Sequence, residues 1–240
     1  MGITDILNRT YVSWMDAAGP ESDIVISTRV RLARNLNQLP FPHLTDEATG
    51  KQLMQKIRAA LPENEEGIFR GLELVSLSQL SPLDRTILVE KHLISPEHAE
   101  SNSPYRGVAV NYDGSVAIMV NEEDHLRIQC LLSGLQVNQA YKYAQTVDDK
   151  LEESLDYAFD SRRGYLTACP TNVGTGMRTS VMLHLPATAM TNQINSLIQN
   201  VTQFGLTVRG MYGEGTEATG RFYQVSNQVT LGQTEEDIIN

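Results

Sequence analysis

The chain has 240 residues, 41% of them hydrophobic and 20% charged, which excludes disorder, collagen or a coiled coil as a description of the whole chain. No stretch approaches the ~18 consecutive apolar residues of a membrane span, the first residues lack the basic and apolar pattern expected of a signal peptide, and the two cysteines make no disulfide scaffold. We therefore expect a cytoplasmic protein. The net charge of −10 argues against a general nucleic-acid binder.

The basic residues are unevenly divided, because arginine accounts for fourteen of the nineteen. Arginine presents a rigid fork of donors that suits phosphate and carboxylate groups. An acidic chain whose positive charge is mostly arginine favours one concentrated cationic pocket.

The first half of the chain predicts an alternation of short strands and amphipathic helices. We expect a strand over 23–27, a helix over 46–61, a strand over 72–77, and a helix that starts at Ser81 and runs to about His92. Ser81, Pro82 and Asp84 supply the N-cap, the first-turn proline and the capping acid of that last helix.

The second half predicts an antiparallel sheet. Asp113-Gly114 between apolar runs 107–111 and 115–120 is a strong hairpin signal. Further strands are expected over 126–132, 165–169, 179–185, 206–211 and 222–229, with helices over 137–158 and 192–204, the latter stopped by Gly205. The fold class is thus α+β, an antiparallel β-sheet flanked by helices, and not a Rossmann arrangement. A capping box at 234–237 predicts the start of a helix, but the chain ends at Asn240. Because a single helical turn is not stable alone, we expect that another segment normally follows.

Two polar clusters lie in the first 130 residues. Arg29 and Arg31 alternate on an expected strand, so they project from one face about 6–7 Å apart and need an anionic partner, unless they form ordinary surface ion pairs. Glu122, Glu123 and Asp124 follow an apolar strand and predict either an exposed acidic turn or a site for a metal or a guanidinium. Arg127 would then face an anion.

Two more clusters lie downstream. The loop 169–178 has polar and glycine residues that let a backbone approach phosphates, although it is not a Walker A loop. Its Cys169 is either a reactive thiol or a packed residue, whereas Cys130 belongs to the core. The segment 209–217 is rich in glycine and reads either as a loop that closes over a ligand or as a flexible hairpin loop.

Together the clusters predict a two-part site. Five arginines, all beside strand ends or loops, suit a triphosphate: Arg29, Arg31, Arg127, Arg178 and Arg209. Three carboxylates suit a cationic co-substrate: Glu122, Glu123 and Glu214.

The motifs STRVR, NEEDH followed by Leu-Arg, CPTN-x-GT-x-x-R and RG-x-x-GE-x-TE resemble those of the ATP:guanido phosphotransferases, the arginine and creatine kinase family. They run in family order from residue 27 to 217. Members that act on small molecules carry a helical N-terminal domain before STRVR, whereas only 26 residues precede Ser27 here. The resemblance is therefore closest to the bacterial members that phosphorylate arginine in proteins. It implies one catalytic domain over 1–240, without the C-terminal phosphoarginine-binding domain of those members.

The resemblance also implies the roles of individual residues. Glu122, Glu123 and Glu214 would hold the acceptor guanidinium, with Cys169 beside it; Glu123 is our choice as base, although Glu122 could exchange roles with it. The nucleotide would contact Ser27, Thr28, Arg29, Val30, Arg31, His92, Arg127, Arg178, Thr179, Ser180, Val181, Met182, Arg209, Gly210, Met211, Tyr212, Gly213 and Glu214.

The implied reaction is transfer of the ATP γ-phosphoryl group to protein arginine, giving phosphoarginine, in bacterial stress response and protein quality control. Mg²⁺ would be bound through the nucleotide, with no protein metal site. Implied partners are proteins with exposed arginines, basic DNA-binding stress repressors among them, an activator protein and the Clp protease machinery, with no membrane and no direct nucleic acid. The acidic segment 148–160 would steer basic partners or is a plain solvated helix face.

Two alternatives stay open on the sequence alone. A phosphagen kinase would act on free arginine or another small guanidino compound. A non-catalytic adaptor would bind nucleotide or partner proteins without turnover.

Overall fold

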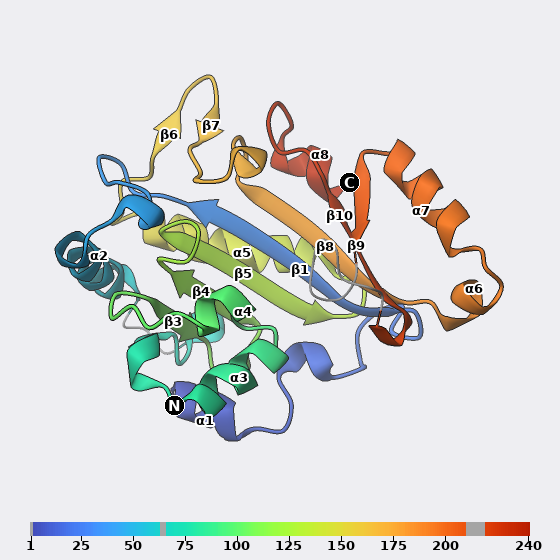
Figure 1. The fold of residues 1–240 in the computed structure, drawn as a ribbon, viewed down its shortest axis with the longest axis horizontal. Helices are drawn as coiled ribbons and strands as arrows, with labels where there is room; N and C mark the ends of the chain where they lie inside the picture. The colour runs from blue at the N-terminus through green and yellow to red at the C-terminus, as the bar shows by residue number, and fades with distance from the viewer. Residues whose placement is uncertain (1, 63–65, 210–218) are drawn as a thin grey trace.

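Eight antiparallel strands form the central sheet, in the order β2-β3-β4-β5-β1-β8-β10-β9 (Figure 1). The computed structural model describes residues 2–62, 66–209 and 219–240. The strands of this sheet are β1 Val25–Arg34, β2 Glu73–Ser76, β3 Gly107–Val110, β4 Val116–Val120, β5 Leu126–Ser133, β8 Met177–His184, β9 Leu206–Arg209 and β10 Phe222–Asn227.

A two-stranded ribbon and several helices surround the sheet. The ribbon pairs β6 Phe159–Asp160 with β7 Gly164–Tyr165. The helices are α1 Ile3–Asn8, α2 Glu47–Ala60, α3 Pro82–Glu90, α4 Pro96–Ala99, α5 Val137–Glu152, α6 Pro186–Met190, α7 Ile194–Gln203 and α8 Glu235–Ile239, and a 3₁₀ turn, η1, spans Ser13–Met15.

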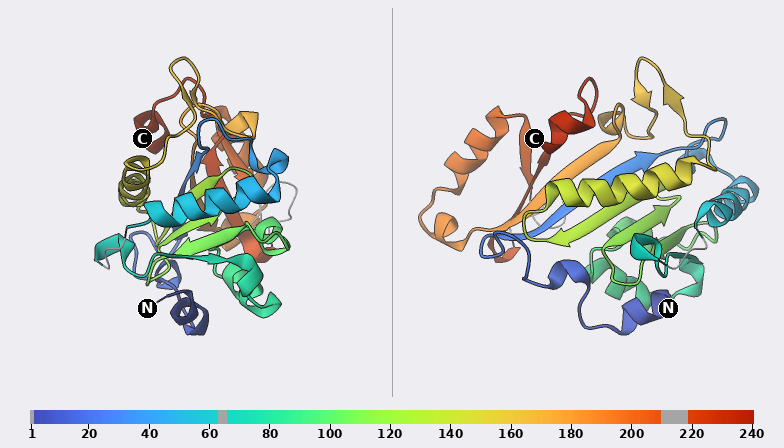
Figure 2. Two further views of the ribbon diagram at one scale, coloured as in Figure 1. Left: turned by 90° about the vertical axis from the view of Figure 1, so that its left-hand side faces the viewer. Right: turned by 180° about the vertical axis from the view of Figure 1, so that it is seen from behind.

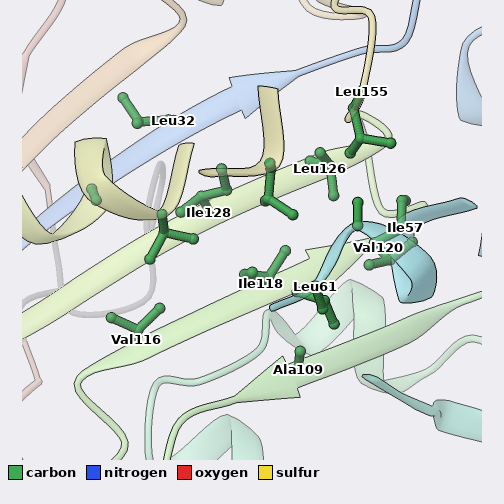
Figure 3. Packing of buried hydrophobic residues seen from close by; sticks show 14 of the residues in the cluster. Leu32, Ile57, Leu61, Ala109, Val116, Ile118, Val120, Leu126, Ile128 and Leu155 are labelled. Atoms are coloured by element: carbon green, nitrogen blue, oxygen red, sulfur yellow. The ribbon is translucent and has the colours of Figure 1, made fainter. Parts of the chain in front are cut away.

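One face of the sheet carries the main hydrophobic core. Helix α5 crosses this face over β1 and β5, and α2 covers the end nearer β3 and β4 (Figure 2, right). Inward side chains such as Leu32, Ile118 and Ile128 pack against Ile57 of α2 and against α5 (Figure 3). Burial of these side chains is the principal source of the stability of the fold.

The opposite face is only partly covered. A second core lies over β3 and β4, where Val108 and Met119 pack with Leu88 of α3 and with Ile6 of α1. Helices α3 and α4 lie on this side in Figure 1. The middle of the same face, over β5, β1 and β8, carries polar and charged side chains.

The sequence predictions agree with the structure at most elements. The antiparallel sheet, the hairpin at Asp113-Gly114 and the capping boxes of α3 and α8 are confirmed. Helix α5, however, ends at Glu152 and not at 158, because Tyr157 forms a bridge with Leu36 and the Ala158 amide donates to the Asn35 carbonyl. Of the expected strand over 165–169, only Tyr165 lies in a strand, the two-residue β7. Strand β1 starts at Val25, later than expected, and continues through Arg34.

A buried ion pair, with its neighbours, connects β1, α5, β7 and α8 on the core side of the sheet. Arg34, at the end of β1, donates to Asp148 of α5 at 2.6 Å and lies over the ring of Tyr165. It also donates to the carbonyl of Thr175 at 3.0 Å and lies 3.8 Å from Glu235 of α8. Burial raises the pKa of Asp148 despite the opposing charge of Arg34. The sequence had suggested that Asp148 belongs to an exposed acidic face, but this carboxylate is buried.

Candidate active site

The strand register gathers the predicted arginines on one face of the sheet. Arg31 of β1 lies opposite Arg178 of β8, and Arg29 lies opposite Ser180. Directly opposed residues in an antiparallel pair point to the same side. On the other flank of β1, Ala33 pairs with Arg127 of β5, which brings a fourth arginine to this face.

Three adjoining cavities run along this face. The largest, of about 580 Å³, is lined by Glu122, Glu123, Cys169, Arg127 and Arg178, among others. A second, of about 180 Å³, shares Arg31, Arg127 and Arg209 with the first and adds Arg29 and His92. A third of about 180 Å³ shares Arg29 and His92 with the second and is otherwise mostly apolar. We call them the acidic, arginine and apolar cavities.

The arginine cavity concentrates positive charge. Burial, followed by the charges of Arg127 and Arg178, lowers the pKa of Arg29 to about 10. Burial, followed by the charges of Arg29, Arg127 and Arg178, also lowers the pKa of Arg31, against the opposing charge of Glu122. Among the described residues, no carboxylate lies within 4.0 Å of either group. Such a cluster is built to receive a multivalent anion.

The two adjacent glutamates of the acidic cavity differ in their surroundings. Glu122 is 8% exposed and accepts from Ser95 at 2.7 Å, whereas Glu123 is 41% exposed. Arg127 bridges them, with Nη1 2.8 Å from Glu122 and Nη2 2.9 Å from Glu123. Burial alone would raise the pKa of Glu122, but Arg127, Ser95 and the Glu123 amide together hold it below its usual value. Glu122 is a fixed anion, and Glu123 is the more accessible of the two.

The next two residues of the same turn position the site. Asp124 accepts from the side chain of Asn35 at 2.6 Å and from the amide of Ala168 at 2.7 Å. His125 accepts the Leu36 amide on Nδ1 and donates from Nε2 to the Pro40 carbonyl. These bonds link the acidic turn to β1 and to the residue just before Cys169. The acidic pair and the thiol therefore share one frame.

The glycines of the 169–178 loop serve packing. Gly174 has φ +114°, and a Cβ there would lie 2.4 Å from the Thr230 carbonyl oxygen; Gly176 has φ +63°, with the Ala33 carbonyl oxygen at 2.7 Å. Only glycine fits both conditions. The sequence had suggested a backbone free to approach phosphates, but these two positions approach the protein's own backbone instead. Cys169 is half-buried, with its Sγ 3.0 Å from the Thr171 hydroxyl.

At the far end of the row, His92 separates the arginine and apolar cavities. It has φ +57°, and its ring meets that of Trp14 edge-on at 5.2 Å. Burial, aided by the charge of Arg29, lowers the pKa of His92 to about 4, so the ring is neutral at pH 7. Ser27, Ser180 and Met182, all predicted nucleotide contacts, line the apolar cavity.

Some predicted nucleotide contacts lie elsewhere. Thr28 and Val30 point to the opposite face, where Val30 joins the core and the Thr28 hydroxyl donates to the Gly134 carbonyl at 2.6 Å. Thr179 and Val181 lie opposite them in β8 and share that face. The side-chain alternation of a strand is the reason. Gly210, Met211, Tyr212, Gly213 and Glu214 lie outside the described residues.

Sequence reasoning missed several lining residues. Glu97 and Arg106 border the acidic cavity, Gln129 and Gln224 the arginine cavity, and Trp14 the apolar one. Only Gln129 carried a signal, because it lies two residues after Arg127 on the same strand. The described part of the chain contains no group of three His, Cys, Asp or Glu that could hold a metal ion. In that same part, no helix is long and apolar enough to cross a membrane.

Comparison with known proteins identifies the family. Residues 52–240 match the ATP:guanido phosphotransferase C-terminal catalytic domain. The chain belongs to the ATP:guanido phosphotransferase family. A curated protein-arginine kinase of Syntrophomonas wolfei is 58% identical over 99% of this chain, and one of Pelotomaculum thermopropionicum is 53% identical over all of it. The chain spans 67% of the length of each.

Solved guanido phosphotransferases share the fold. The duplicated taurocyamine kinase of Schistosoma mansoni, with bound transition state analog components, superimposes with a TM-score of 0.81 at 28% identity, covering 97% of this chain and 33% of that one. Lombricine kinase gives a TM-score of 0.77 at 24% identity over 90% of this chain and 62% of that one. The antiparallel sheet flanked by helices is therefore the fold of this family.

Proposed function

We propose that the chain transfers the γ-phosphoryl group of ATP to the guanidinium group of arginine residues in proteins. The observation that carries this proposal is the order of the three cavities. An apolar pocket suits a base, the arginine cavity suits a triphosphate, and the carboxylates of the acidic cavity suit a guanidinium. The protein-arginine kinase relatives support the same substrate pair.

The nucleotide would lie along this row with its phosphates among Arg29, Arg31, Arg127, Arg178 and Arg209. We propose that Mg²⁺ arrives bound to the phosphates. When bound, the ion would neutralise charge on the transferring group. The arginines supply fixed donors to the same oxygens, which is where phosphoryl transfer needs charge stabilisation.

The acceptor needs a base, because a guanidinium stays protonated in water. In the reaction an N–P bond forms at the arginine, the bond between the γ-phosphorus and its bridging oxygen breaks, and a proton leaves the attacking nitrogen. We assign that proton to Glu123, which is more exposed than Glu122 and is not bonded to Ser95. Glu122 would orient the fork, with Glu214 as a second clamp and Cys169 alongside.

The exposure of Glu123 in the acidic cavity favours an acceptor arginine that belongs to another protein. The Glu123 carboxylate is 41% exposed, so a side chain projecting from a folded surface can reach it. The net charge of −10 favours basic protein substrates. DNA-binding stress repressors as substrates, and activator and Clp protease partners, rest on the family resemblance and stay predictions, as does a catalytic unit confined to residues 1–240.

One assay tests the proposal. The protein is incubated with MgATP and either a basic protein or free arginine, and the products are analysed for phosphoarginine by mass spectrometry without acid treatment. We expect phosphoarginine on the protein. Product on free arginine or another small guanidino compound alone would favour the second candidate, which the shared fold with taurocyamine and lombricine kinases supports. No product with either acceptor would contradict both.

A further inference from the structure

Trp14 enters the apolar cavity from the N-terminal segment, far in sequence from the motifs of the site. Its turn, η1, is fixed to the sheet because the Ser13 amide donates to the Asp113 carbonyl at 2.9 Å. The indole Nε1 donates to the Lys91 carbonyl at 2.9 Å. The Lys91 ammonium in turn donates to the carbonyls of Ile6 and Arg9. Both ends of the segment are thus tied to residue 91.

The residue after Lys91 is His92, and Trp14 packs against it. The two rings are nearly perpendicular, at 82° and 5.2 Å. On the other side, the Gln129 amide donates to the carbonyls of His92 at 2.8 Å and Leu93 at 3.0 Å. His92 is held between the indole and β5 in a left-handed conformation, φ +57°, that non-glycine residues adopt only when their surroundings impose it.

The cavity bounded by these rings fits one flat apolar group. Its remaining walls are mainly Ile26, Leu131, Met182 and Phe222, with a few polar groups such as Gln224 at the rim. Arg29 lies at its boundary with the arginine cavity. A ligand that fills both cavities therefore has an aromatic part joined to an anionic part, as a nucleoside triphosphate has.

We propose that Trp14 is a nucleotide-binding residue that forms one wall of the base pocket and, through His92, sets the shape of its entrance. This inference rests on the proposed function, because it assumes that ATP occupies the row of cavities. It assigns to the N-terminal segment a direct part in recognising the base, separate from the arginines that bind the phosphates.

The chain itself offers a direct probe, because Trp14 is its single tryptophan. ATP and inorganic tripolyphosphate are titrated into the protein while tryptophan emission is recorded, with calorimetry as an independent measure of binding. We expect both to bind and only ATP to change the emission. Binding of ATP without a change in emission, or an equal change with tripolyphosphate, overturns the inference and leaves the proposed function intact. Absence of any ATP binding by calorimetry overturns both.

Substitution separates a base-pocket role from a structural one. Trp14→Ala should weaken ATP binding about tenfold, the size of effect expected for one aromatic surface against a base, and leave tripolyphosphate binding unchanged. The KM for ATP should rise with kcat little changed. Tyr11→Ala, which removes a 71% exposed aromatic ring from the same segment, is the matched control and should change neither.

A second variant, Trp14→Phe, is used in case Trp14→Ala fails to fold. Trp14→Phe retains a ring against His92 and loses only the bond to Lys91, so it should fold and bind ATP within about threefold of the parent. Equal losses of ATP and tripolyphosphate affinity in either variant would overturn the inference, because they would show a general loss of the cavity and not of its base-binding wall.

Discussion

Arg127 lies 2.9 Å from Glu123, so one of the chain's own guanidinium groups contacts the carboxylate that we assign as base. The same side chain lines both the acidic and the arginine cavities. Arg127 thus connects the two halves of the site and shows that the glutamate pair accepts a guanidinium fork. A phosphate in the arginine cavity would compete with these glutamates for Arg127.

Glu123→Gln tests the base. We expect kcat on an arginine-containing peptide to fall by about 10²-fold or more, because the amide cannot accept the proton, while ATP affinity stays within a few fold. Glu153→Gln removes an exposed carboxylate that lines none of the three cavities and is the control. A near-normal rate in Glu123→Gln would show that the base lies elsewhere, with Glu122 the next residue to test.

Arg31→Met tests the uncompensated cations. Arg31 is half-buried among Arg29, Arg127 and Arg178, so loss of its charge should relieve repulsion and raise the free energy of unfolding by about 1 kcal/mol in buffer without phosphate. The same change should weaken ATP binding about tenfold or more, since one charge-assisted donor is lost. Urea denaturation and calorimetry measure the two effects. Arg162→Met, on an exposed turn, should alter neither. A destabilised Arg31→Met variant would contradict the electrostatic argument.

Acid conditions should destabilise the fold through His92 and His98. Burial lowers the pKa of each to about 4, below the ordinary value of 6.5. Between these two pKa values the unfolded chain binds more protons than the folded chain. The free energy of unfolding is therefore highest above pH 6.5 and declines as the pH falls toward 4. His92→Gln should reduce this loss of free energy of unfolding between pH 6.5 and 4, by at most about 3 kcal/mol. Urea denaturation across pH 4.5–7 measures it; an unchanged slope would contradict the assignment.

Asp148→Asn tests the buried pair behind the sheet. Removing this carboxylate leaves the Arg34 guanidinium without its 2.6 Å partner in a buried site, which should lower the free energy of unfolding by about 3 kcal/mol. Lys51→Met, which breaks an exposed pair with Glu47 on α2, should cost less than about 0.5 kcal/mol. Equal effects in the two variants would mean that Arg34 finds full compensation elsewhere.

The two cysteines should differ in reactivity. Cys130 is fully buried, and burial raises its pKa far above the usual value, whereas Cys169 is half-buried in the wall of the acidic cavity. A thiol-specific reagent should modify one cysteine per native chain and both in denaturant. Peptide mapping should locate the native modification at Cys169. Modification of Cys130 in the native state would contradict the packing of β5.

Local sequence patterns were sufficient for much of the fold. The capping boxes at Ser81 and Thr234 predicted the helices that start there, and Asp113-Gly114 predicted a hairpin. These signals depend only on residues a few positions apart. Periodicity failed at the end of α5. Leu155 and Ala158 continue the helical spacing, but pairing of residues 157–158 with 35–36 prevails, and that contact is invisible to a local pattern.

The site was predictable where residues alternate on one strand. Spacing alone placed Arg29 and Arg31 on one face, and the motifs named their partners. The nucleotide contacts implied by the resemblance also included Thr28 and Thr179, whose side chains occupy the other face, since a run of consecutive residues does not separate the two sides of a strand. Trp14, Glu97 and Arg106 could not be found, because tertiary packing alone brings them to the cavities.

The described arginines of the site come from strands β1, β5, β8 and β9, whose sequence positions span residues 29 to 209. No two neighbouring strands can supply the pocket, and a shift of one residue in any pair would turn an arginine into the core. The cationic site therefore comes into being only when the central sheet is fully registered. In a partly folded chain the arginines are too far apart to repel one another or to bind an anion together. Phosphate binding during refolding should therefore appear with the last step of sheet assembly.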